Sequence, residues 1–121
     1  MDVADIRLKR AYEVPAPDDG VRILVERLWP RGVKKSDAAI DHWVKDISPS
    51  PELRKWFGHR PELWGEFRQR YAAELRQNAD GVADLRKLCA SGRVTFVFAA
   101  KDQDRNSAVL LRDFLLGGGK T

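Results

Sequence analysis

Cysteine is almost absent from this sequence, since Cys89 is the only one among 121 residues. An internal disulfide needs two cysteines, so a disulfide-stapled fold is excluded, and a lone thiol is typical of the reducing cytoplasm. The chain also lacks an apolar run near the roughly 20 residues that span a bilayer. Its first residues, Met-Asp-Val-Ala-Asp, contain no apolar signal core. We therefore expect a cytoplasmic protein without a membrane partner.

Motifs for metals and cofactors are missing as well. The chain has two histidines and one cysteine without close ligand spacing, which does not predict a structural zinc site. It contains no Gly-x-Gly-x-x-Gly string and no Walker-type loop. The glycines at 117–119 follow a helical pattern, whereas a phosphate loop precedes its helix. The sequence therefore predicts no metal and leaves any cofactor unknown.

Charge is plentiful but unevenly distributed. Charged residues make up 33% of the chain and hydrophobic residues 43%, which suits one core and argues against disorder. The segment from Arg7 to Lys35 contains eight basic and four acidic residues, an excess equal to the +4 of the whole chain. This modest excess makes the protein basic and compatible with an anionic partner, without requiring one.

Three segments have the pattern of β-strands. Residues 5–12 alternate apolar and charged side chains, which is the period of a half-buried strand. Residues 21–28 contain the apolar run Ile23-Leu24-Val25, which indicates burial on both faces. Residues 93–100 are β-branched or aromatic with almost no charge, and they give the strongest strand prediction in the chain.

Helical patterns occupy much of the remaining sequence. Ser50 and Pro51 are typical of a helix start and Gly58 of a helix end, which predicts a helix over 51–57. Residues 37–47 place apolar side chains on one helical face but are too short to decide. Further helices are predicted from Pro61 to about Asn78, from Asp80 to Gly92, and from about Asn106 to Leu116.

The order of these elements predicts an α/β fold. We expect a small, mostly parallel sheet of three or slightly more strands, flanked by about four helices, in one domain over residues 1–121. The helical block between the second and third strands is long enough for a parallel crossover. The loop between the first two strands is too short for a standard one, so that pair is antiparallel or not adjacent. Residues 117–121 are predicted to be a flexible tail.

Several strings match a known residue pattern over nearly the whole chain. The most specific is Arg27-Leu28-Trp29-Pro30-Arg31-Gly32. Others are Leu8 to Tyr12, Trp43 to Ser50, Leu53 to His59, Phe67 to Tyr71 and Ala99 to Asp102. Together they resemble the YeaO-like branch of domain-of-unknown-function family 488. The resemblance implies a fold and a residue pattern but no particular reaction.

This chain departs from the family pattern at a few positions. The pattern usually has aspartate in place of Glu26, alanine in place of Ser48 and tyrosine in place of Phe98. The first change keeps a carboxylate and lengthens its reach by one carbon. More distant relatives carry a Cys-His pair after the last strand, where this chain has Asn106-Ser107, and this difference weighs against a thiol mechanism.

Two polar loops are predicted to form a ligand site. Ligands of open α/β sheets bind beyond the carboxyl ends of the strands, and the N-terminus of a helix there favours an anion. The loop after the second strand and the loop between the third strand and the last helix lie at this position if the second and third strands are parallel. They contain Glu26, Arg27, Trp29, Arg31, Lys101, Asp102, Asp104 and Asn106.

We assign roles within these loops by charge. Arg27, Arg31 and Lys101 are predicted to clamp a phosphate or carboxylate, with Glu26 or Asp102 as the acid or base. Arg10 and Asn106 are further predicted ligand contacts. The alternative is structural, with Arg27 pairing with Asp102 or Asp104, and Asp104 or Asn106 capping the helix.

Three other side chains have both a functional and a structural interpretation. His59 is a candidate acid or base, or else an exposed loop residue or helix cap. Tyr71 lies three residues before Glu74 and either shares a cleft with it or belongs to the core. Trp29 stands between two arginines and either stacks on a base or plugs the end of the sheet.

Two functions remain open from the sequence. The first is a small enzyme or ligand-binding protein with a site for a phosphate-bearing or nucleotide-like anion at the carboxyl ends of the strands. The alternative is a nucleic-acid-binding module that uses the basic segment 7–35 with Trp29. A homo-oligomer is neither predicted nor excluded.

Overall fold

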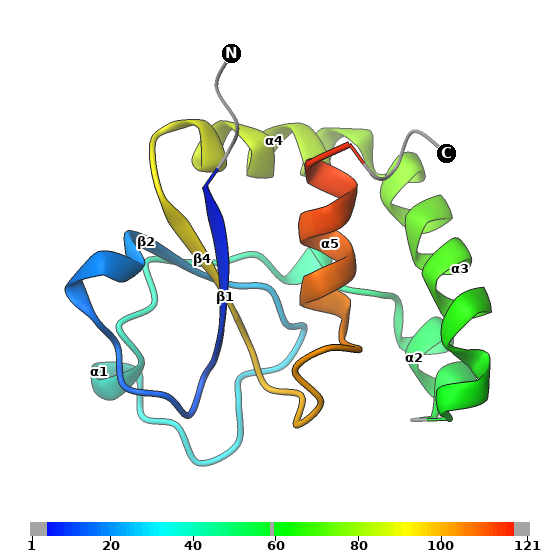
Figure 1. The fold of residues 1–121 in the computed structure, drawn as a ribbon, viewed down its shortest axis with the longest axis horizontal. Coiled ribbons are helices and arrows are strands. Elements are labelled where there is room, and N and C mark those ends of the chain that lie inside the picture. The colour runs from blue at the N-terminus through cyan, green and yellow to red at the C-terminus, as the bar shows by residue number, and fades with distance from the viewer. Residues whose placement is uncertain (1–4, 59, 118–121) are drawn as a thin grey trace.

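The centre of the fold is a parallel β-sheet (Figure 1). The computed structural model describes residues 5–58 and 60–117. Within them, the sheet has four strands in the order β1-β4-β2-β3, and every neighbouring pair is parallel. The strands are β1 (Ile6–Arg10), β2 (Val21–Leu24), β3 (His42–Trp43) and β4 (Val94–Phe98). The predicted α/β class with a mostly parallel sheet is confirmed.

The pairing of the first strand, which the sequence left open, is now defined. Strand β1 is not adjacent to β2, because β4 lies between them and pairs with both. Leu8 and Ile23 are both registered against Phe96, so the three strands end at the same edge. Because every pair is parallel, the loops that follow the strands meet at this one carboxyl edge, where ligand sites of α/β sheets form.

Helices cover one face of this sheet (Figure 1). They are α2 (Pro51–Phe57), α3 (Trp64–Gln77), α4 (Ala79–Ala90) and α5 (Ser107–Leu115). The larger core lies between them and the sheet, with Ile23, Phe96 and Leu111 fully buried at its centre. Strand β4, which had the strongest strand prediction, is buried at all five positions.

The helix starts are set by side-chain caps. Ser50 accepts a hydrogen bond from the Leu53 N–H at the start of α2, as predicted. Asn106 accepts one from the Val109 N–H at the start of α5, which was part of the structural alternative for this residue. Helix α4 begins at Ala79, one residue before the predicted start at Asp80, and its cap is Asn78. Asn78 also ends α3, and its side chain accepts from Gly81 N–H, so one residue serves both helices.

Residues 35–47 do not form one helix. They contain the short helix α1 (Lys35–Ala38), strand β3 and a 3-10 turn at Lys45–Ile47. Ile40 and Trp43 pack on the face of the sheet opposite the long helices, while Ile47 enters the larger core. The apolar residues of this segment therefore serve two faces, which a single helical stripe cannot do.

The crossover from β1 to β2 passes over that opposite face without an α-helix. It contains one 3-10 turn, Pro17–Asp19, and returns through Gly20. Gly20 has φ +69°, and a Cβ there would lie 2.1 Å from the Arg93 carbonyl oxygen. Glycine is therefore required where the crossover enters the sheet.

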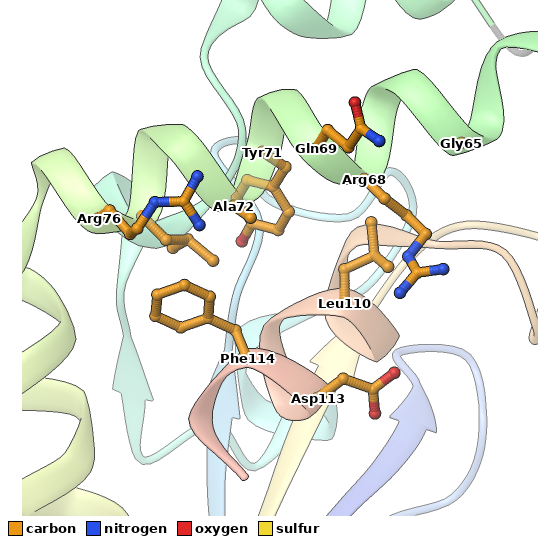
Figure 2. Close-up of a pocket in the computed structure, with 10 residues that line it drawn as sticks. Gly65, Arg68, Gln69, Tyr71, Ala72, Arg76, Leu110, Asp113 and Phe114 are labelled. Atoms are coloured by element: carbon orange, nitrogen blue, oxygen red, sulfur yellow. The ribbon is translucent and has the colours of Figure 1, made fainter. Parts of the chain in front are cut away.

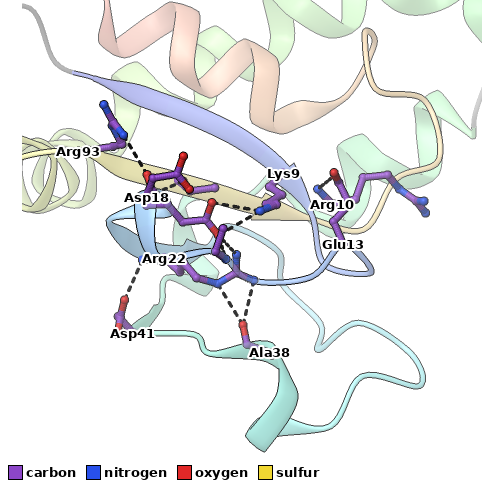
Figure 3. Close-up of polar contacts among 11 residues, drawn as sticks. Lys9, Arg10, Glu13, Asp18, Arg22, Ala38, Asp41 and Arg93 are labelled. Carbon is purple, nitrogen blue, oxygen red and sulfur yellow. Dashed lines mark hydrogen bonds and ion pairs between the residues drawn. The ribbon is translucent and has the colours of Figure 1, made fainter.

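A buried ionic network fixes this crossover (Figure 3). The Asp19 carboxylate accepts from Arg22 at 2.7 Å and from Lys9 at 3.1 Å, and Arg22 is only 3% exposed. The Arg22 guanidinium also donates twice to the Ala38 carbonyl, and Thr95 donates its hydroxyl to the Asp19 main chain. The network thus connects β1, the crossover, α1 and β4.

In residues 5–58 and 60–117, no helix is both long and apolar enough to cross a membrane.

We predict that Asp19→Ala destabilises the protein by about 3–5 kcal/mol, because Arg22 then stays buried without its counter-charge. Urea unfolding followed by far-UV circular dichroism measures the loss. The matched control is Asp5→Ala, which removes an exposed ion pair with Arg93 and should cost much less. Equal stability of the two variants would contradict this role for Asp19.

The same network predicts a pH dependence. Burial acts to raise the pKa of Asp19, but hydrogen bonds from Ala16, Lys9 and Arg22 outweigh it and lower the pKa below 3.8. A carboxyl with a lowered folded pKa stabilises the fold above its unfolded pKa, and this stabilisation is lost as pH falls through the folded value. The stability difference between wild type and Asp19→Ala should therefore be constant above about pH 5 and shrink below about pH 4.

Candidate functional site

A cavity of about 500 Å³ opens at the carboxyl edge of the sheet. Its lining comes from the ends of β2 and β4, from α2 and the start of α3, and from the turn that leads into α5. In Figure 1 strands β1 and β4 run downward, and the chain after β4 turns into the start of α5. The cavity therefore lies where the topology predicts a ligand site.

Glu26 is the acidic residue of this lining. Its side chain is half-buried, and its Oε2 accepts a hydrogen bond from the Ala99 N–H at 2.9 Å. Its main-chain carbonyl accepts from the Trp43 indole N–H at 2.7 Å. Glu26 therefore holds the chain after β2 to the chain after β4, and it also anchors the edge strand β3.

Three basic residues line the same cavity. Arg54 and Lys55 come from the last turn of α2, and Arg105 directly precedes the Asn106 cap of α5. All three are exposed at the mouth. Asn106 and Ser107 bring the N-terminus of α5 to the wall, which adds the positive end of a helix dipole. The site is therefore electropositive apart from Glu26.

Aromatic rings form another wall. Phe57, Trp64 and Phe67 all line the cavity, and they also contact one another. Ring centroids lie 4.5 Å apart for Phe57 and Phe67, 5.6 Å for Trp64 and Phe67, and 6.0 Å for Phe57 and Trp64. Phe67 is buried, whereas Phe57 and Trp64 are half-buried and keep accessible ring surface. The cavity thus combines a cationic rim with an apolar wall.

Of the residues predicted for the site, Glu26 and Asn106 line this cavity. Asp102 lies nearby in sequence, but its carboxylate is exposed and accepts from the N–H groups of Arg105 and Asp104, each at 2.9 Å. These two backbone hydrogen bonds lower the pKa of Asp102, and the one from Arg105 has the larger effect. Asp102 therefore shapes the turn before α5. Lys101 is exposed and is not part of the lining.

Two of the predicted arginines hold main-chain carbonyls around the site. Arg10 donates to the carbonyl oxygens of Ala100 and Ala99, at 2.9 and 3.4 Å. Arg27, which was predicted to clamp an anion or else to pair with Asp102 or Asp104, donates to those of Ser48 and Pro49, at 3.4 and 3.5 Å. Within the described residues, the buried Arg27 Nε has no hydrogen-bond partner. Both side chains therefore support loops behind the lining.

Trp29 and Arg31 are not part of the lining of this cavity. The Trp29 indole donates to the Val33 carbonyl at 2.6 Å, and its ring meets Trp43 edge-on at a centroid distance of 5.4 Å. Both rings pack with Leu24 on the face opposite the long helices. Trp29 thus packs against that face of the sheet. This is closer to its structural interpretation, in which the ring covers the end of the sheet, than to stacking on a base. Arg31 is exposed in the turn that follows.

Tyr71 belongs to the core. It is 2% exposed, and its hydroxyl donates to the Ile47 carbonyl at 2.6 Å. Burial, together with the negative charges of Glu26 and Glu74, raises the pKa of Tyr71 above its usual range. Glu74 accepts from the Ser50 N–H and hydroxyl and so braces the start of α2. His59 lies outside the described residues.

A second hollow of about 350 Å³ lies between α3 and α5 (Figure 2). Leu110 and Phe114 of α5 point toward α3, and Arg68 and Arg76 lie at its two ends. Tyr71 lines it, but the Tyr71 hydroxyl is bonded to Ile47. This hollow is away from the strand ends and contains none of the other predicted site residues, so we do not assign the function to it.

The described residues contain neither a cluster of metal-binding side chains nor an exposed cysteine. Within residues 5–58 and 60–117, no group of three or more His, Cys, Asp or Glu side chains is arranged to hold a metal ion. Cys89 is buried in α4, and burial raises the pKa of its thiol to about 11. A protonated, buried thiol is a poor nucleophile.

The cationic and aromatic lining was not predicted from the sequence. None of Arg54, Lys55, Arg105, Trp64 and Phe67 was among the predicted site residues. The only local signal was position, since Arg54 and Lys55 end a helix at Gly58 and Arg105 precedes a helix cap. Their common cavity depends on where α2 lies relative to β4, which is a long-range property.

The core role of Tyr71 predicts that Tyr71→Phe costs about 1–2 kcal/mol, because the buried Ile47 carbonyl loses a donor. Chemical denaturation measures the loss. Tyr12→Phe is the matched control, because the exposed Tyr12 hydroxyl donates to the Arg31 carbonyl at 3.2 Å and its removal should have little effect. If the two variants have the same stability, the Tyr71 hydrogen bond is not structural.

The similarity of this chain to known proteins extends over nearly its whole length. A family model described as the inactive DUF488-N3 subclade matches residues 5–119. The uncharacterized proteins Rv3073c of Mycobacterium tuberculosis and Mb3100c of Mycobacterium bovis are each 45% identical over 112 residues, which is 93% of this chain and 94% of theirs. The uncharacterized protein YeaO of Escherichia coli is 42% identical over 111 residues, 92% of this chain and 96% of its own. No solved structure matches this chain.

Proposed function

The chain belongs to the inactive DUF488-N3 subclade, and on that premise we propose that it is a ligand-binding protein whose strand-end cavity takes a small anion, such as phosphate or a carboxylate. The observation that carries the proposal is the charge of the lining. Arg54, Lys55 and Arg105 line a cavity of about 500 Å³ in which Glu26 is the one acidic residue of the described lining. Guanidinium and ammonium groups bind such anions with charge-assisted hydrogen bonds.

Binding without catalysis has three supports. The subclade is described as inactive. Asp102, one of the predicted acids or bases, is exposed and hydrogen-bonded within its own turn. The remaining carboxylate, Glu26, holds the Ala99 N–H and so has a structural task. A general acid or base needs a position beside the reacting group and freedom to exchange its proton.

The nucleic-acid alternative has weaker support from the same geometry. In the basic segment 7–35, Lys9 and Arg22 are committed to the Asp19 network, and Arg10 holds two carbonyls. The Trp29 ring packs against the sheet, so it does not offer a stacking platform. Of the remaining cations, Arg7 lies in β1, Lys35 begins α1, and the other three lie in the chain between β2 and α1. Nucleic-acid binding through them would weaken steeply with salt.

The anion proposal is tested with a triple variant, Arg54→Ala, Lys55→Ala and Arg105→Ala. We expect inorganic phosphate to bind the wild type and the triple variant to bind it at least tenfold more weakly, because charge-assisted hydrogen bonds are lost. Isothermal titration calorimetry measures Kd, and the thermal shift with added phosphate gives a second readout.

The control for this test is the pair Arg68→Ala and Arg76→Ala at the second hollow, which also removes exposed positive charge. It should bind phosphate like the wild type. Equal phosphate binding by wild type, triple variant and control would refute the strand-end site. A steep salt dependence of single-stranded oligonucleotide binding, without phosphate binding, would favour the alternative.

A further inference from the structure

We infer that the anion is the phosphate of a nucleoside monophosphate, whose base lies against the aromatic wall of the strand-end cavity. The inference rests on the proposed function and adds the class of ligand. It is drawn from four features of one lining: its volume, its accessible rings, its single carboxylate and its excess of positive charge.

The volume is the first feature. About 500 Å³ lies within the range of roughly 300–1,000 Å³ that is typical of small-molecule sites. A bare phosphate held at the mouth by Arg54, Lys55 and Arg105 leaves most of this space empty. The cavity therefore has room for a ligand with a second, larger part that extends inward from the cationic rim.

The aromatic wall defines that second part. Phe57 and Trp64 are half-buried, and both line the cavity. Behind them, Phe67 is buried and stacks on both rings, which fixes their orientation. A preformed wall of this kind favours a flat, apolar-faced group, and stacking on an aromatic side chain is tolerant of base identity. A nucleobase has this shape.

Glu26 gives the ligand its direction. Its Oε2 accepts from the Ala99 N–H, and Oε1 forms no hydrogen bond within the described residues. A carboxylate repels a phosphate, so the phosphate lies at the cationic rim and a hydrogen-bond donor lies at Glu26. The hydroxyls of a ribose and the exocyclic amino group of a base are such donors.

The balance of charge separates this ligand from an aromatic amino acid. An amino acid also combines an anion, a donor and a ring, but its net charge is zero. Three cations and one carboxylate line the cavity. This excess of positive charge matches a phosphate monoester, which carries about −1.5 to −2 at pH 7.

The test compares ligands on the wild-type protein by calorimetry. The probes are inorganic phosphate, adenosine, the four ribonucleoside 5′-monophosphates and phenylalanine. We expect at least one monophosphate to bind tenfold or more tightly than phosphate, adenosine or phenylalanine. Stacking on aromatic side chains accounts for a gain of this size.

Two variants assign the contacts. Glu26→Gln keeps an oxygen that accepts from Ala99, and it should weaken monophosphate binding about tenfold while phosphate binding is unchanged or stronger. Phe57→Leu keeps an apolar side chain without a ring and should weaken the monophosphate alone. Arg68→Ala, at the second hollow, should change neither. If Phe57→Leu does not fold, Glu26→Gln and the wild-type comparison still decide.

The outcomes separate the two proposals. Monophosphate binding no tighter than phosphate binding, or unchanged in both variants, would overturn the nucleotide inference and leave the anion site in place. Tighter binding of phenylalanine would overturn it in favour of a zwitterionic ligand. Failure of all phosphate-bearing probes to bind would overturn the proposed function itself.

Discussion

The buried pair of Asp19 and Arg22 is the constraint on which the architecture depends. A short crossover without an α-helix connects two parallel strands that are separated by β4, so few apolar contacts can hold it. Its attachment is ionic instead, and Arg22 extends it to α1 through the Ala38 carbonyl. This crossover is short and covers one face of the sheet with few side chains. All the long helices pack on the other face.

That division of layers determines where a ligand site can form. With α2, α3 and α5 on the same face, the end of one and the starts of the other two meet at the carboxyl edge of the sheet. The Glu26–Ala99 hydrogen bond closes the floor between β2 and β4. The cations and rings then line a space that the topology had already placed beyond the strand ends.

The sequence allowed a good prediction of elements whose signals are local. Strand β4 is marked by its composition, and helices α2 and α5 by Ser50 and Asn106 at their starts. Strand β3 has two residues, which is too short for any periodic pattern to appear. Its edge position follows from parallel pairing with β2, a contact that no local pattern encodes.

The candidate site was only partly predictable, for a related reason. Glu26 and Asn106 follow directly from strand and helix ends, so their place at the carboxyl edge could be inferred. The path of the chain after Glu26 could not be inferred in the same way, because Trp29, next to the Pro30–Gly32 turn, packs on the opposite face of the sheet. Likewise, Arg54 and Lys55 reach the cavity only because the chain between β3 and β4 wraps α2 over the strand ends.

The residues whose pKa values are clearly shifted have structural positions in the fold. General acid–base catalysis at neutral pH works best with a pKa near 7. Among the groups whose pKa values are clearly shifted, Tyr71 and Cys89 are raised by burial, while Asp19 and Asp102 are lowered. Each of these shifts moves a group away from neutrality, so it fixes one protonation state. None of these four residues lines the strand-end cavity, so their fixed protonation states stabilise the fold, and the charge of the cavity comes from Arg54, Lys55, Arg105 and Glu26.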